Sequence, residues 1–248
     1  MPRGGRTVNG RIRRLAPLLA GVAVLLLLAA GPGTRLGLWS FGTGFVLLRW
    51  GAYLGIFAAG LGLLTLLWRP AGARPWPALA AVLLGALAAL MPYRWMQTAQ
   101  RVPPIHDITT DVERPPEFQA VLPLRADAPN PAEYGGSEIA AQQRQAYPDI
   151  APLTLELSPA ESFRRALAEA RGMGWAIVAA DSAAGRIEAT ATTAWFGFKD
   201  DVVVRIAPEG SGSRVDVRSV SRVGQSDVGA NAARIREYLQ RLGRRPDG

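Results

Sequence analysis

The sequence contains no cysteine and a single histidine, His106. Disulfide bonds, thiolate nucleophiles, thiolate zinc sites and iron–sulfur clusters are therefore excluded. Acidic residues are absent from the first 98 residues, which nevertheless hold ten arginines. The positive charge of that segment therefore has no counter-charge within it.

The net charge of the whole chain does not describe its parts. The 248 residues carry a formal charge of +8, but residues 99–248 hold 18 basic against 20 acidic side chains, a net charge of −2. Nucleic-acid binding depends on basic residues that neutralise phosphates. Because the basic excess lies in the first 98 residues, we expect no nucleic-acid partner.

Three apolar runs occupy residues 15–30, 45–68 and 76–93. A membrane-spanning helix needs about 20 apolar residues. The first run is short and also resembles the core of a signal peptide, so its cleavage stays open. Small residues such as Gly51, Gly55 and Gly62 favour close contact between helices. We therefore expect a three-helix transmembrane region at residues 1–98.

The arginines predict the orientation of these helices, because basic residues favour the cytoplasmic side. Only Arg35 lies in the first loop, and Arg94 and Arg101 after the third run oppose the trend mildly. We expect a multi-pass protein of the bacterial inner membrane with a cytoplasmic N-terminus and a periplasmic C-terminal domain. The arginines expected on the cytoplasmic side are Arg3, Arg6, Arg11, Arg13, Arg14, Arg69 and Arg74.

Residues 99–151 contain eight prolines. Proline removes backbone donors and restricts φ, so long regular elements are not expected here apart from a helix near residues 135–147. The composition predicts a connector that wraps the surface of the following domain.

Residues 152–248 have the pattern of an α+β domain. An alternating strand leads to a helix with a capping box at Ser158 and Glu161, then to four strands and a last helix that starts near Ser226 or Asp227. This order, β-α-β-β-β-β-α, predicts an antiparallel sheet of about five strands with two helices on one face. The other face is polar and is expected to be open to water or a partner.

Several motifs occur together in a fixed order: "IHDITTD", "QRQAYPDI", "RIEATATTAWFGFKDDVVVRI" and "DVRSVSRVGQSDVGANAARI". In this arrangement the chain resembles the membrane-anchored form of the bacterial family called domain of unknown function number 1499. The resemblance covers about residues 102–243. It implies a shared domain, but it supplies no reaction, cofactor or ligand.

The residues that suit catalysis are His106, Asp107, Asp111 and Ser221. A serine hydrolase needs a base and an acid that orients it, but the nucleophile motif G-x-S-x-G is absent. One histidine among prolines is also a weak pattern for a metal site. We therefore expect no metal or cofactor.

A second candidate site lies where the last strand leads into the last helix, because a helix N-terminus attracts anions. Arginines there could hold a small anion or carboxylate. Alternatively, Ser226 or Asp227 caps the helix, the arginines pair with Asp107, Asp111 or Asp149, and residues 105–111 dock onto this corner. The candidate ligand-binding residues are Arg218, Ser219, Arg222, Asp227, Asn231 and Arg234.

Two functional hypotheses follow. The first is a binding or scaffolding module of the cell envelope, whose partner is an envelope protein or a small anionic ligand. The second is an envelope hydrolase that uses His106 with Ser221 or an aspartate. Whether the chain is an enzyme is left open by the sequence.

Overall fold

The computed structural model describes the main chain of residues 4–244 and the side chains of residues 13–244. Arg3 and the side chains of Arg6 and Arg11, used above for orientation, lie outside this description. The chain divides into two compact units. The first comprises Met1–Thr98 with Ala194–Gly197, and the second comprises Ala99–Thr193 with Phe198–Gly248.

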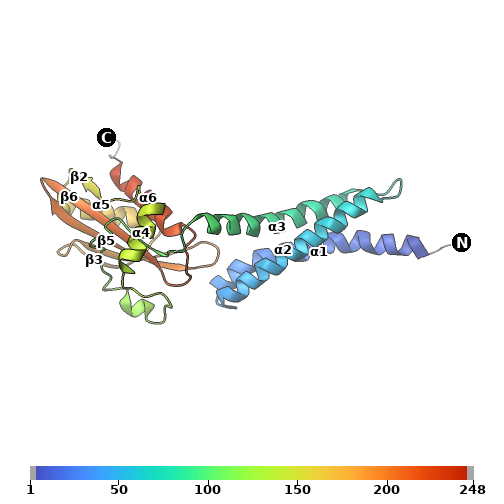
Figure 1. The fold of residues 1–248 in the computed structure, drawn as a ribbon, viewed down its shortest axis with the longest axis horizontal. Helices are drawn as coiled ribbons and strands as arrows, with labels where there is room; N and C mark the ends of the chain where they lie inside the picture. The colour runs from blue at the N-terminus through green and yellow to red at the C-terminus, as the bar shows by residue number, and fades with distance from the viewer. Residues whose placement is uncertain (1–3, 245–248) are drawn as a thin grey trace. The chain divides into compact units, whose positions relative to one another are not determined.

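Three helices form the first unit, and Figure 1 draws them in blue to green. They are α1 (Gly4–Arg35), α2 (Phe41–Leu67) and α3 (Trp76–Arg101). Within the described residues, all three are long and apolar enough to cross a membrane. In α1 this stretch runs over the 23 residues Arg13–Arg35, because the helix continues beyond the apolar run of the sequence. The helix that contains the first apolar run is therefore long enough to span a membrane.

Glycines of α2 let the helices of this unit approach closely. A Cβ atom added at Gly55 would lie 2.7 Å from the carbonyl oxygen of Gly85, and one at Gly62 would lie 2.9 Å from that of Ala78. Any larger side chain at these positions would push α3 away. The predicted contact through small residues is thus confirmed.

The second unit contains an antiparallel sheet in the order β1-β6-β5-β4-β3, with β2 also pairing with β6. The strand after the last hairpin turn, β6, is central, since β1 and β2 pair with its two halves. The strands are β1 (Asp107–Thr109), β2 (Leu153–Leu155), β3 (Ala176–Asp181), β4 (Arg186–Thr192), β5 (Lys199–Glu209) and β6 (Gly212–Ser221).

Two helices, α5 (Pro159–Gly172) and α6 (Ala230–Gly243), cover one face of this sheet, as predicted. The capping box at Ser158 and Glu161 begins α5. Tyr238 of α6 stacks on Trp175 with ring centroids 4.9 Å apart and donates a hydrogen bond to the Ala166 carbonyl. Alternating residues of β4, β5 and β6 supply the apolar side of this core.

The opposite face is not open, so the expectation of an exposed polar face was wrong. The connector lies over it, and Phe118 and Val121 pack on Val203 and Val220. The charged side chains of this face are buried beneath it, among them Glu188, Asp201, Asp216 and Arg218. The polar residues at alternate positions of these strands therefore form a second buried layer, which consists largely of charged side chains.

The connector has more regular structure than its prolines suggest. It contains β1, the 3-10 turn η1 (Leu122–Arg125) and α4 (Gly136–Ala146), of which only α4 was predicted. Residues 107–109 pair with residues 218–220 of β6, so the predicted docking of residues 105–111 is confirmed.

Candidate functional site

The sheet separates the candidate ligand-binding residues into two groups. Neighbouring residues of a strand point to opposite faces. Arg218 and Arg222 therefore lie on the connector face, whereas Ser219 and Ser221 lie on the helix face. The contacts below follow this division, so the six candidates do not line one common pocket.

Arg218 forms a buried ion pair with Asp107 across β6 and β1. Its Nε and Nη2 atoms donate to the two carboxylate oxygens at 2.9 and 2.7 Å. The guanidinium also donates to the carbonyls of Pro116 and Ala132 and lies over the ring of Phe118. Arg218 therefore fastens the connector at several points.

Arg222 pairs with Asp201 of β5 in the same bidentate manner, at 2.9 and 2.8 Å. Asp201 also lies 3.3 Å from Nη1 of Arg125, which comes from the 3-10 turn of the connector. Burial lowers the pKa of Arg125, and the charge of Asp201 opposes that effect. One carboxylate thus holds two arginines under the connector.

Asp111 completes the charged layer. One of its oxygens accepts from the backbone amides of Glu113 and Arg114, and the other lies 3.1 Å from Arg205 and 3.2 Å from Arg214. Burial alone would raise the pKa of Asp111, but these amides and guanidiniums together lower it below its usual value. The carboxylate is therefore ionised at neutral pH and fixed in place.

The helix face carries a separate polar cluster centred on Asn231. Its Oδ1 accepts from the Ser219 hydroxyl at 2.7 Å, and its Nδ2 donates to Ser221 Oγ and to the His106 carbonyl. Arg234 pairs with Asp200 at 2.6 Å. These contacts join α6 to β1, β5 and β6.

The N-terminus of α6 is capped by the protein itself. The carboxylate of Asp227 accepts from the amides of Gly229 at 2.8 Å and Asn231 at 2.6 Å. Burial raises the pKa of Asp227 despite these bonds. Val228 and Gly229 have positive φ angles of 55° and 81°, so the helix begins at Ala230, later than the sequence suggested. The Asp227 side chain therefore already engages two of the amides at this helix N-terminus, those of Gly229 and Asn231.

The predicted arginine pairing is correct for Arg218 and Asp107 only. Arg222 and Arg234 use Asp201 and Asp200 instead, and Asp149 pairs with Arg236. The two acids of β5 point to opposite faces, as their adjacency requires.

The catalytic candidates are near one another in the main chain, because the Ser221 amide donates to the His106 carbonyl at 3.0 Å. Their side chains bond elsewhere: His106 Nδ1 lies 3.3 Å from the Gln225 carbonyl, and Ser221 Oγ accepts from Asn231. Asp107 and Asp111 are held by arginines. Among the described residues, no group of three histidines or acids could hold a metal ion.

Sequence reasoning missed Glu188, which is fully buried in β4. Its carboxylate accepts from the backbone amides of Gln119 and Val121 at 3.0 Å and pairs with Arg186. It therefore binds the connector through the main chain. The available signal was a lone acid within a strand of alanine and threonine.

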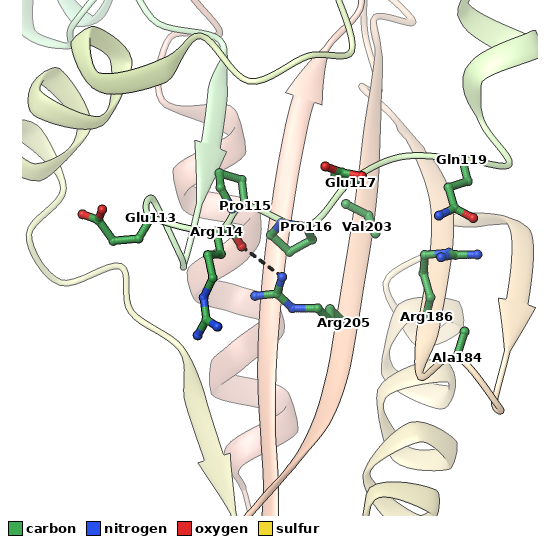
Figure 2. A pocket seen from close by; sticks show the side chains of 10 residues that line it. All are labelled: Glu113, Arg114, Pro115, Pro116, Glu117, Gln119, Ala184, Arg186, Val203 and Arg205. Atoms are coloured by element: carbon green, nitrogen blue, oxygen red, sulfur yellow. Dashed lines mark hydrogen bonds between the residues drawn. The ribbon is translucent and has the colours of Figure 1, made fainter.

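Two pockets lie beside the connector. The larger, of about 490 Å³, is drawn in Figure 2, where Arg205 reaches the carbonyl of Arg114. The smaller, of about 380 Å³, is lined by Phe118, Tyr134 and Arg218 among others. Pro115 and Glu117 line both pockets, which therefore flank one strip of the connector.

Tyr134 is the second residue of interest in this region. Its hydroxyl is a buried atom and has no hydrogen-bond partner within the described residues. Burial and the charge of Asp107 raise the pKa of Tyr134 to about 12, so the hydroxyl stays protonated. Tyr134 lines the smaller pocket, and its hydroxyl is a buried donor that has no acceptor among the described residues.

Comparison with known proteins supplies a family and no activity. No curated protein matches the chain. The family model described as "Protein of unknown function (DUF1499)" matches residues 107–242, which span β1 through α6. This agrees with the resemblance seen in the motifs, and the chain belongs to the DUF1499 family.

Proposed function

We propose that the protein is a multi-pass protein of the bacterial inner membrane whose periplasmic domain is a binding or scaffolding module. Three apolar helices support membrane integration. The distribution of arginines supports a cytoplasmic N-terminus. The domain's charged side chains pair with one another and fasten the connector, which is an arrangement suited to a stable binding surface.

One observation carries the binding function: Tyr134 lines the pocket beside Arg218, and its buried hydroxyl has no hydrogen-bond partner among the described residues. Buried polar groups are nearly always hydrogen-bonded in native proteins. A hydrogen-bond acceptor on a ligand would give this hydroxyl a partner, and the ring of Phe118 would supply apolar contact. The proposed ligand is a segment of an envelope protein or a small anionic molecule that inserts an acceptor there.

The adjacent larger pocket suits a partner with both signs of charge. Its rim holds the exposed acids Glu113 and Glu117 and the exposed Arg114. A peptide lying along the connector strip could contact both pockets, since Pro115 and Glu117 separate them. A small anion would use the smaller pocket alone.

Site-specific photocrosslinking in native membranes tests this proposal. A photoreactive amino acid at Leu122, which lines the smaller pocket, is expected to capture a defined species. The same amino acid at Arg171, exposed on α5, serves as the control on the helix side. Tyr134→Phe is expected to reduce capture at Leu122 without loss of stability, because it removes an unsatisfied hydroxyl. Capture that is equal at both positions and unaffected by Tyr134→Phe would contradict the proposal.

A hydrolase is the second candidate, because the main chain of His106, directly before β1, is hydrogen-bonded to Ser221, the last residue of β6. The imidazole would have to leave the Gln225 carbonyl and accept the Ser221 proton. A fluorophosphonate probe tests this directly, since it labels activated serines. Labelling that is abolished by Ser221→Ala and by His106→Ala would support the hydrolase, and absence of labelling of the native chain would exclude an activated Ser221.

A further inference from the structure

A pocket of about 300 Å³ lies among the three helices of the first unit. Arg13 and Arg14 of α1 and Arg74 from the segment before α3 line it together with Thr65 of α2. Residues 1–98 contain no acid, so no carboxylate of this segment neutralises these three guanidiniums. The fold therefore gathers positive charge at one point without supplying the counter-charge.

Tight packing next to the pocket fixes the helix backbones that carry the arginines of α1. Ala16 and Ala20 of α1 pack against Ala58 of α2 and Ala81 of α3, and all four have no exposed surface. Arg13 lies one turn before Ala16. Because the backbones cannot separate without losing this contact, the helices keep the three arginines around one pocket. An anion bound between them would supply the counter-charge that this segment lacks.

The pocket lies where the three apolar spans end on one side. Arg13 is the first residue of the first span, Thr65 is close to the end of the second at Leu67, and Arg74 precedes the third at Trp76. Trp68 and Trp76 are exposed at the same ends, as is typical of the membrane interface. This level of a bilayer contains lipid phosphates.

Phosphate matches the pocket chemically. Guanidinium groups bind phosphate oxygens through paired, charge-assisted hydrogen bonds. The Thr65 hydroxyl donates to the Leu61 carbonyl at 2.7 Å, so the donors available to a phosphate come from the arginines. Three positive charges favour a headgroup with net negative charge over a zwitterionic one.

We propose that this pocket binds the phosphate of an anionic phospholipid headgroup. The inference rests on the membrane integration proposed above, but it is independent of the function of the periplasmic domain. A lipid bound here would join all three helices at their arginine-rich ends.

The test uses the full chain in nanodiscs that contain equal amounts of phosphatidylglycerol and phosphatidylcholine. Lipid retained after transfer to detergent is identified by native mass spectrometry. The native chain is expected to retain phosphatidylglycerol, and the variant Arg13→Gln/Arg14→Gln/Arg74→Gln to retain at least about tenfold less. A matched variant, Arg49→Gln/Arg94→Gln/Arg101→Gln, removes the same charge elsewhere and is expected to bind as the native chain does.

Single variants keep the test decisive if the triple variant does not fold. Arg14 and Arg74 are exposed, so Arg14→Gln and Arg74→Gln should leave the helix packing intact. Each is expected to lower retention of phosphatidylglycerol about threefold to fivefold. Unchanged retention in both, or equal retention of phosphatidylcholine, would overturn the proposal.

Free phosphate is distinguished by competition. Millimolar inorganic phosphate is expected to leave the bound lipid in place, and complete displacement of the lipid would assign a free-phosphate site instead. Because both faces of the nanodisc have the same composition, the result does not depend on orientation. Carbonate extraction of native membranes tests integration separately, so failure of the lipid site and failure of membrane insertion give different results.

Discussion

The two units of the molecule use arginine in opposite ways. In the second unit, buried or partly buried arginines pair with acids: Arg218 with Asp107, Arg222 with Asp201 and Arg234 with Asp200. In the first unit, the arginines share a segment that contains no acid. The comparison teaches that arginine is a structural residue in the domain, whereas the segment that forms the helical unit supplies no acid to pair with its arginines.

The two faces of the domain's sheet also differ in how they are held. The larger apolar core, with the polar contacts of Asn231 and Arg234, holds the helices on one face of the sheet. On the other face, ion pairs and backbone hydrogen bonds hold the connector around a small apolar cluster. Hydrophobic contacts tolerate changes of pH, but ion pairs do not. The connector should therefore be the part of the domain that responds to the loss of single charges.

The largest effect is expected from Arg218→Ala. It leaves Asp107 charged and buried without its partner, at a cost of about 3–5 kcal/mol in the free energy of unfolding. Urea unfolding of the full chain, followed by pulse proteolysis of the domain, measures this. The double variant Asp107→Asn/Arg218→Met removes both charges and should lose markedly less. A double variant as unstable as Arg218→Ala would show that the ion pair is not the cause.

Glu188→Ala should come next. It leaves the amides of Gln119 and Val121 without their acceptor and Arg186 without its partner, which costs about 2–4 kcal/mol. Limited proteolysis should then cut within residues 113–135, because the connector is released locally. Glu209→Ala, on an exposed acid of β5, is the matched control and should leave the connector protected. Protection of the connector in both variants would refute its attachment through Glu188.

The stability that Asp111 contributes to the domain is expected to depend on pH. Its pKa is lowered in the folded state, so its stabilising contribution is fully present above the unfolded value of about 3.9 and is lost as pH falls through the folded pKa. Asp111→Asn should cost about 1–2 kcal/mol at pH 7, a value discounted for the part-exposed arginines. The difference between native chain and variant should shrink below about pH 4. A difference that stays constant down to pH 2 would contradict the assignment.

The smallest effect is expected in the first unit. Arg49 is exposed on α2, so Arg49→Gln should change the thermal stability of the solubilised chain by less than about 0.5 kcal/mol. The small effect expected for Arg49→Gln is the baseline against which the losses of stability in the domain variants are compared. A loss as large as that of Arg218→Ala would mean that Arg49 has a structural partner, and the contrast between the units would fail.

Hydrophobic periodicity was sufficient to predict most of the fold. Val202, Val204 and Ile206 marked one face of β5, and Ser158 with Glu161 marked the start of α5. By contrast, β1 could not be found, because Asp107 and Thr109 face a charged layer and the strand has only three residues. Its pairing depends on β6, which lies more than 100 residues later.

The candidate site was predictable only in part. The docking of residues 105–111 onto the arginine-rich corner was one of two alternatives that the sequence left open, and the structure confirms it. The alternation of β6 also places Arg218 and Ser219 on opposite faces, which the sequence analysis did not take into account. Tyr134 gave no pattern and Glu188 only that of a lone acid in a strand, since their significance comes from what the connector covers. Such contacts depend on the path of a chain that has little regular structure.

Topology tests the central claim most directly, because the arginine-rich ends of the first unit, in a segment without acids, are proposed to face the cytoplasm and the paired arginines of the domain the periplasm. Alkaline phosphatase and green fluorescent protein, fused in turn after residue 248, report the two compartments. The account predicts active phosphatase and a dark fluorescent protein, with the reverse pattern for fusions within residues 69–75. A bright fluorescent protein with inactive phosphatase at residue 248 would contradict it.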